Sequence, residues 1–206
     1  MNSSDYEELV KGIQEPPTTP SDETVQWAAN HLQANGYDRR LPQNFDVAVQ
    51  FLAALKDRIR SKGLCVFGKV GVGKTAVARV IAKTACFRWW DSARLARVYQ
   101  SDPEHFMEIV AGDIYGVDPL VIDDLGHEPT VNDYGTRLEV MGEAISRRSA
   151  VYDRTGIPTI ITSNLDIEDI VERYGERTMS RIEGMCNIIV FEGGDQRQTG
   201  NDDYLG

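Results

Sequence analysis

Residues 68–75 have the sequence GKVGVGKT, and this segment constrains the chain more than any other. A short apolar run at residues 64–67 precedes it, and residues 74–84 follow with apolar side chains at helical spacing. Glycines let the backbone wrap closely around phosphate groups, and the start of the following helix adds partial positive charge at the same place. The pattern G-x-x-x-x-G-K-[ST] between a strand and a helix therefore predicts a phosphate-binding loop.

Within this loop, we expect Lys74 to reach the outer phosphates of ATP and the Thr75 hydroxyl to bind Mg²⁺. ATP and Mg²⁺ are therefore the expected cofactors. A glycine-rich turn without a ligand is the alternative, and the flanking strand and helix count against it. The residues expected to surround the phosphates are Gly68, Val70, Gly71, Val72, Gly73, Lys74, Thr75 and Ala76.

A second apolar run, residues 120–122, ends in Asp123 and Asp124. In open α/β sheets, ligands bind at the carboxyl ends of the strands, so these side chains are expected at the ligand edge. We expect Asp123 to bind the magnesium ion, together with Thr75, and Asp124 to orient the attacking water. An ordinary strand that happens to end in aspartate is the alternative, because that pattern is common on its own.

A third apolar run, residues 159–162, ends in three small polar residues, Thr162, Ser163 and Asn164. A hydroxyl or amide at that position could hold the lytic water or contact the γ-phosphate. The residues alone favour the alternative, a turn that caps the strand and opens the next helix.

Arg177 and Arg181 lie four residues apart in a segment expected to be helical, so they share one helix face. Two exposed arginines on one face could contact the nucleotide of a neighbouring subunit. A solvated basic face, paired with Glu172 or Glu176, is the alternative that the residues alone favour.

The 206-residue chain is 41% apolar and 26% charged, which is ordinary globular composition, and its net charge is −10. That acidic balance disfavours non-specific coating of duplex DNA, which depends on lysine and arginine. The three cysteines, Cys65, Cys86 and Cys186, are widely spaced with apolar flanks, so we expect buried strand residues rather than disulfides or a zinc site. No apolar run approaches about 18 residues, and we expect a cytoplasmic protein without membrane contact.

The chain divides into an acidic N-terminal arm (1–46), a core (47–197) and an acidic tail (198–206). The arm is expected to hold a short helix at 5–14 and another at 24–34, and it is a candidate partner-binding extension. In the core, short apolar runs alternate with helical ones, which predicts an α/β fold with a parallel sheet covered on both faces. The expected strands are 64–67, 86–90, 120–122, 159–162 and 187–191, and the expected helices are 47–60, 74–84, 92–100, 103–111, 134–153 and 166–183.

Taken together, these motifs resemble those of the AAA+ ATPases, and within that family the DnaC-type helicase loaders and the related IstB-type transposition ATPases. The resemblance covers roughly residues 44–197 and implies a P-loop fold. The implied sheet has five parallel strands in the order 5-1-4-3-2, with helices on both faces and without the C-terminal lid domain of larger members. It rests on GKVGVGKT (68–75), LVIDDLG (120–126), PTIITSNL (158–165), YGERTMSRI (174–182) and NIIVFEG (187–193).

The resemblance also implies roles for particular residues. Lys74 and Thr75 match the Walker A lysine and hydroxyl, and Asp123 matches the Walker B acid. Asp124 stands where many members have the catalytic glutamate. Asn164, with Ser163 beside it, matches the sensor 1 position. Arg181 matches the arginine finger, with Arg177 beside it at the subunit contact. No residue matches the sensor 2 arginine, and Arg197, near the end of the chain, is not assigned that role. The expected catalytic residues are Lys74, Asp123, Asp124, Asn164 and Arg181.

By the same resemblance, the chain is expected to be an assembly-dependent ATPase that loads a replicative helicase. Its expected partners are that helicase, single-stranded DNA and further copies of the chain in an ATP-dependent oligomer or spiral. An IstB-like transposition ATPase, a small-molecule P-loop kinase and a nucleotide-gated module with little hydrolysis stay open as alternatives. Candidate DNA contacts, for which ordinary helix surface and core is the favoured alternative, are Arg94, Arg97, Tyr99, His105 and Phe106.

Overall fold

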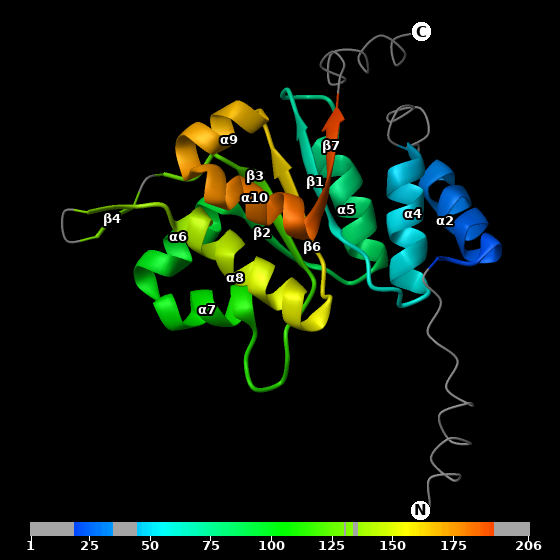
Figure 1. The fold of residues 1–206 in the computed structure, drawn as a ribbon, viewed down its shortest axis with the longest axis horizontal. Coiled ribbons are helices and arrows are strands. Elements are labelled where there is room, and N and C mark those ends of the chain that lie inside the picture. Colours follow the sequence, from blue (N-terminus) through cyan, green and yellow to red (C-terminus); the bar gives the residue numbers. More distant parts are fainter. Residues whose placement is uncertain (1–18, 35–44, 130, 134–135, 192–206) are drawn as a thin grey trace, which may run out of the picture.

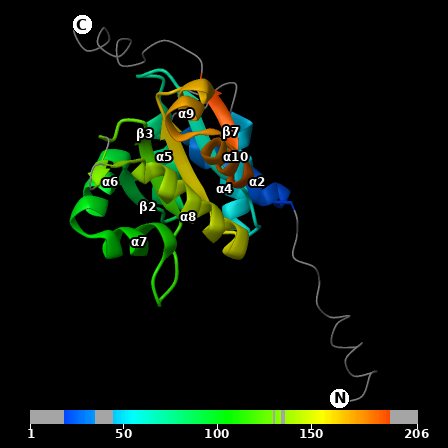
Figure 2. The ribbon, with the colours of Figure 1, turned by 60° about the vertical axis from the view of Figure 1, so that its left-hand side comes forward.

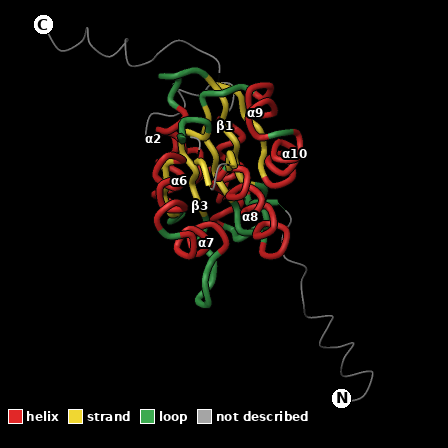
Figure 3. The backbone as a smooth tube through the Cα atoms, turned by 90° about the vertical axis from the view of Figure 1, so that its left-hand side faces the viewer, coloured by secondary structure: helices red, strands yellow, loops and turns green. Residues whose placement is uncertain are grey.

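The computed structural model describes residues 19–34, 45–129, 131–133 and 136–191, with the side chains of 131–138 left out of the description. The expected helix at 5–14, Arg197 and the acidic tail lie outside these residues. The described part of the chain forms three layers, in which a parallel sheet lies between two layers of helices (Figures 1 and 3).

The central sheet has five parallel strands in the order β2-β3-β6-β1-β7. Numbered along the chain, this order is 2-3-4-1-5, which is the expected 5-1-4-3-2 counted from the other edge. The predicted α/β fold class and strand order are therefore confirmed. The strands are β1 (Gly63–Gly68), β2 (Arg88–Asp91), β3 (Leu120–Leu125), β6 (Thr159–Ser163) and β7 (Cys186–Phe191).

Alternating strand residues separate the core into two clusters, one on each face of the sheet. Leu64 and Val66 of β1 face one cluster, whereas Cys65 and Phe67 face the other. The first cluster is completed by α2 (Asp22–Ala34), α4 (Phe45–Lys56) and α5 (Lys74–Thr84). The second is completed by α6 (Ser92–Ser101), α7 (Pro103–Ala111), α8 (Val140–Thr155), α9 (Ile167–Tyr174) and α10 (Glu176–Met185). Seen from the side in Figure 2, helices cover the sheet in front and behind.

Two segments that were each expected to form a single helix are divided in the structure, so both predictions are wrong. Residues 134–153 were expected to be one helix, but β4 (Val131–Asp133) and β5 (Thr136–Leu138) form an antiparallel hairpin before α8 begins at Val140. The segment 166–183 is two helices, because Gly175 at φ 84° ends α9 and precedes α10. Glycine adopts this left-handed conformation without steric strain and disfavours a continuous helix.

Cysteine burial follows the prediction at two of three positions. Cys65 and Cys186 are buried on strands, and burial raises the pKa of both thiols, that of Cys186 to about 12. Cys86 is exposed, contrary to the prediction, since it lies before β2 in a turn with φ 57°. The apolar pattern of residues 86–90 places the strand two residues too early.

Helix α2 of the N-terminal arm packs directly on the core. Ala28 and Leu32 are fully buried in the cluster with α4 and α5. At the start of the helix, Ser21 Oγ accepts a hydrogen bond from the backbone N–H of Thr24 at 3.3 Å, and the Thr24 hydroxyl donates to Asp57 at 2.7 Å. The boundary at residue 46 stays a prediction, but the second helix of the arm does not stand apart from the core. Among the described helices, none is long and apolar enough to cross a membrane.

Arg148 of α8 is a fully buried cation at the amino-terminal edge of the sheet. Its guanidinium donates to the Thr159 hydroxyl at 2.8 Å and to the backbone carbonyls of Pro158 at 3.1 Å, Asp118 at 3.2 Å and Val110 at 3.4 Å. Burial lowers the pKa of Arg148 to about 10, so the side chain stays charged at neutral pH. One side chain therefore joins α8 to the end of α7 and to the segments that begin β3 and β6.

Replacing Arg148 with alanine should lower the free energy of unfolding by about 3 kcal/mol, because buried acceptors lose their donor and a cavity remains. The neighbouring Arg147 is the matched control, since it is exposed and forms an ion pair with Glu143 of the same helix at 2.6 Å. Arg147→Ala should cost less than about 0.5 kcal/mol. Urea unfolding followed by circular dichroism measures both variants, and equal costs would contradict a structural role for Arg148.

Candidate nucleotide-binding site

The loop between β1 and α5 has the backbone that a phosphate-binding loop requires. Gly71 and Gly73 have φ angles of 87° and 95°, a conformation that side chains disfavour. A Cβ atom added at Gly68 would lie 2.6 Å from the carbonyl oxygen of Phe191, so only glycine fits there. Gly73 precedes α5 and no side chain caps that helix. The positive end of α5 therefore opens onto the loop, where an anion is stabilised.

Lys74 lies inside this loop, with only 4% of its surface exposed. Its ammonium donates to the carbonyl oxygens of Gly68 at 2.7 Å and Lys69 at 2.8 Å, and to Asn164 Oδ1 at 2.7 Å. A buried ammonium is costly unless it is hydrogen-bonded, so these oxygens hold the charge at the centre of the loop. The contact with Asn164 also joins the loop to the end of β6.

Asp123, at the carboxyl end of β3, is a buried carboxylate next to this loop. Its Oδ1 accepts hydrogen bonds from the Thr162 hydroxyl at 2.6 Å and the Thr75 hydroxyl at 3.1 Å. Burial raises the pKa of Asp123, while the hydrogen bond from Thr162 opposes that shift.

Thr75 and Asp123 are the residues that fit a magnesium ion. Mg²⁺ prefers oxygen ligands and usually takes only one or two from the protein, with phosphates and waters completing its shell. A hydroxyl and a carboxylate already 3.1 Å apart provide such a pair. Within the described ranges, no cluster of three or more His, Cys, Asp or Glu side chains could hold a metal by itself.

Asp124 is held in a strained conformation beside Asp123. Its φ of 56° is unusual for a residue other than glycine, and the pairing of β3 with β6 is irregular at this point. The Thr162 hydroxyl accepts from its backbone N–H at 3.0 Å, and the Ser92 hydroxyl donates to its carbonyl at 2.7 Å. Its carboxylate accepts from Asn164 Nδ2 at 3.3 Å. The surroundings therefore fix the Asp124 side chain towards Asn164.

The structure brings together five of the residues singled out in the sequence, although they come from three separate segments. Asn164 bridges Lys74 and Asp124, and Asp123 bonds to Thr75. Ser163 instead donates to the Leu125 carbonyl and is buried, so it supports the strand ends. Arg177 and Arg181 lie on α10, the first exposed and the second half-buried, and no hydrogen bond or ion pair among the described residues joins them to this network.

Of three supporting side chains, Thr162 was among the small polar residues noted in the sequence, and Ser92 and Arg79 were missed. Thr162 bonds to both aspartates, Ser92 holds the Asp124 backbone, and the charge of Arg79 lowers the Asp123 pKa slightly. Thr162 had a visible signal, since a hydroxyl ends a buried strand there. Ser92 and Arg79 had none, because their roles depend on how α6 and α5 pack beside β3.

The candidate DNA contacts are mostly engaged in packing. Phe106 is fully buried, and Tyr99 packs edge-on against it with ring centroids 5.1 Å apart. Arg94 lies over the Trp90 ring at 4.4 Å, and His105 pairs with Glu108 at 3.2 Å. Phe106 therefore cannot stack on a base in this conformation. Arg97 is exposed, so it stays a candidate DNA contact.

A cavity of about 660 Å³ lies beside the phosphate-binding loop. Gly68 and Lys69 of the loop, Asn164, and the ends of β1 and β7 line it. Two exposed apolar side chains, Ile167 and Val190, stand at this cavity. The open space therefore adjoins the same carboxyl edge as Lys74 and Asp124.

No protein-family model and no curated protein matches this chain, whereas solved structures do. The structure of DnaI is 20% identical over 73% of this chain and 86% of its own, with a TM-score of 0.58. AMPPCP-bound DnaA from Aquifex aeolicus is 18% identical over 75% of this chain and 49% of its own, with a TM-score of 0.55. The DnaC helicase loader is 23% identical over 73% of this chain and 91% of its own, but its TM-score of 0.49 is too low to carry weight.

At these identities the likeness is one of fold. It agrees with the strand order of the sheet and with the position of the loop between β1 and α5. The resemblance to AAA+ ATPases is thus confirmed at the level of architecture, and the described residues have the P-loop AAA+ fold.

Proposed function

We propose that this chain binds ATP and Mg²⁺ at the loop of residues 68–76 and hydrolyses the nucleotide. The observation that carries the proposal is the network at the carboxyl edge of the sheet that contains Lys74, Thr75, Asp123, Asp124 and Asn164. Its two parts, Lys74–Asn164–Asp124 and Thr75–Asp123, are joined by Thr162. Each side chain has the chemical type that its role needs, and the uncapped start of α5 supplies the anion-binding backbone.

The expected roles follow from the present contacts. Lys74 exchanges its carbonyl and Asn164 partners for the outer phosphates, while Thr75 and Asp123 ligate Mg²⁺. Asn164, released from Lys74, contacts the γ-phosphate or the lytic water, and Asp124 orients that water. When bound, the metal would neutralise charge on the phosphates.

We further propose that the protein acts in DNA replication as an ATP-dependent loader of a replicative helicase, assembled into an oligomer through α10. The shared fold with DnaI and with DnaA, a replication initiation protein, supports this role, as do the Arg177 and Arg181 positions on α10. The N-terminal arm is the proposed partner-binding extension, and single-stranded DNA is a proposed ligand of the assembly.

Co-purification with the cognate replicative helicase tests this role, with and without ATP and single-stranded DNA. We expect ATP to strengthen the complex. A complex with a transposase, and none with the helicase, would favour the IstB-like alternative. Phosphate transfer from ATP to a small acceptor would instead favour a kinase.

Lys74→Ala should weaken ATP binding about 10-fold to 100-fold, because the buried ammonium supplies charge-assisted hydrogen bonds to phosphate. Isothermal titration calorimetry with ATP and Mg²⁺ measures the affinity. Lys69→Ala is the matched control, since its side chain is exposed in the same loop. Unchanged affinity of Lys74→Ala would contradict the site itself.

Asp124→Asn should reduce hydrolysis about 100-fold or more while leaving ATP affinity nearly unchanged, because the amide cannot accept a proton from water. Steady-state phosphate release at saturating ATP measures the effect. Glu168→Gln, an exposed carboxylate at the neighbouring cavity, serves as the control. Wild-type turnover no higher than that of Lys74→Ala would instead indicate a nucleotide-gated module that barely hydrolyses.

Arg181→Ala should lower the hydrolysis rate about 1,000-fold at high protein concentration, with ATP binding retained, if this arginine reaches a neighbour's nucleotide. In the wild-type protein, activity per subunit should rise with protein concentration. Arg177→Ala, measured in parallel, decides which of the two arginines acts. Normal hydrolysis by Arg181→Ala at high concentration would show that the finger assignment is wrong.

A further inference from the structure

Glu128 is a buried carboxylate that lies just beyond the proposed catalytic residues. Only 5% of its surface is exposed, and it follows Asp124 by four residues in the segment that leaves β3. Its Oε2 accepts from the backbone N–H of Gly126 at 2.9 Å, and its Oε1 accepts from the Tyr174 hydroxyl. The same Oε1 forms an ion pair with Arg173 at 3.0 Å. A buried carboxylate with this many donors fixes the groups around it.

Arg173 and Tyr174 hold this segment from the last turn of α9. Arg173 donates to the backbone carbonyl of Gly126 and to that of Glu128, the latter at 2.7 Å. Burial, followed by the charge of Glu128, raises the pKa of Tyr174, which keeps its hydroxyl protonated as a donor. We name Glu128, Arg173 and Tyr174 the loop–helix clamp.

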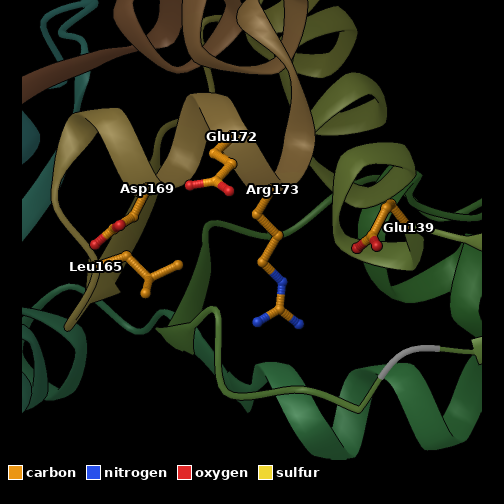
Figure 4. A pocket seen from close by; sticks show the side chains of 5 residues that line it. All are labelled: Glu139, Leu165, Asp169, Glu172 and Arg173. Atoms are coloured by element: carbon orange, nitrogen blue, oxygen red, sulfur yellow. The ribbon is translucent and has the colours of Figure 1, made fainter.

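A cavity of about 540 Å³ borders the clamp, with Arg173 reaching from α9 across to the segment and Glu139 on the far side (Figure 4). Arg173 Nε is buried without a hydrogen-bond partner among the described residues. The clamp therefore has open space beside Arg173 and one unused donor on that side chain.

The clamp connects two parts of the proposed ATPase. On one side, a Cβ at Gly126 would lie 2.4 Å from Leu165 Cδ1, so the segment after Asp124 presses against the residue after Asn164. On the other side, Tyr174 directly precedes Gly175, whose φ of 84° forms the joint between α9 and α10. Nothing lies within 4 Å of a Cβ built at Gly175, so no side chain packs against this glycine itself.

We propose that the clamp is a positioning device that ties the start of α10, and thereby its arginines, to the segment that follows Asp124. This inference rests on the proposed function. Glu128 does not act on the reacting atoms. It orients the helix whose arginine completes the nucleotide site of a neighbouring subunit.

Buried Met179 and Ile182 pack α10 on the core. The clamp acts at the start of this helix, because α10 follows the end of α9 directly at Gly175. If Glu128 loses its charge, Arg173 loses its ion pair, and one amide oxygen is left for the Gly126 N–H and the Tyr174 hydroxyl. Arg173 keeps its bonds to two backbone carbonyls, so the end of α9 is held more weakly and not released. A displacement of about 1 Å in a catalytic group lowers the rate by roughly 100-fold.

Glu128→Gln tests the proposal, because it keeps the shape of the side chain and removes its charge. Hydrolysis at high protein concentration should fall about 10-fold to 100-fold, with ATP affinity within about twofold of wild type. The decisive measurement mixes Glu128→Gln with Lys74→Ala subunits. Lys74→Ala has a defective nucleotide site of its own, but it has an intact clamp and α10, so the mixture should hydrolyse several-fold faster than the sum of its components.

Two further mixtures distinguish the possible explanations. A mixture of Arg181→Ala with Lys74→Ala should regain activity, and a mixture of Glu128→Gln with Arg181→Ala should not. If only the Arg181→Ala and Lys74→Ala pair recovers, Glu128 acts within its own subunit and the inference is overturned. If neither mixture that contains Lys74→Ala recovers activity, the proposed hydrolysis between subunits is wrong, and the inference is wrong with it.

Tyr174→Phe replaces Glu128→Gln in these measurements if Glu128→Gln is unstable in a thermal melt. It removes one hydroxyl from the clamp and preserves the ring, so the same mixing behaviour is expected with a smaller loss of rate. Hydrolysis by Tyr174→Phe and by a folded Glu128→Gln at the wild-type rate, over the full range of protein concentration, would also overturn the inference.

Discussion

The hydrogen bonds to the buried carboxylate of Asp123 are the interaction on which the rest of the site depends. The Thr162 and Thr75 hydroxyls both donate to one of its oxygens, and these groups belong to β6 and α5. A buried carboxylate is costly unless it is hydrogen-bonded, so a shift of either element against β3 would leave it unpaired. One atom therefore aligns the phosphate-binding loop with the strand that carries both aspartates.

Charged groups are concentrated at the two ends of the strands, with an apolar sheet between them. Lys74 and Asp123 are buried at the carboxyl end, and Arg148 is buried at the amino end. Arg148 bonds mainly to backbone carbonyls and serves the fold. The carboxyl end instead carries a strained Asp124 and an ammonium held by exchangeable oxygens. Strain of this kind is commonly maintained where a protein does its chemistry.

Much of the fold was predictable because its signals are local. Apolar runs located the five strands of the sheet, and the glycine pattern located the loop before α5. Predictions were wrong where one local pattern covered two structures. The apolar spacing of 134–153 concealed the β4–β5 hairpin, and helical spacing on both sides of Gly175 concealed the joint between α9 and α10. Cys86 was misjudged because an exposed turn precedes β2 within the same apolar run.

The sequence by itself located the candidate phosphate-binding loop, the two aspartates at the carboxyl end of β3 and the asparagine after β6, since each is a short motif whose chemistry is local. Only the tertiary structure decided that Asn164 lies between Lys74 and Asp124, that Thr162 serves both aspartates, and that Glu128 joins the end of β3 to α9. These contacts link residues 38 to 90 positions apart. They arise when parallel strands end at a common edge, and no local pattern encodes which side chains then meet.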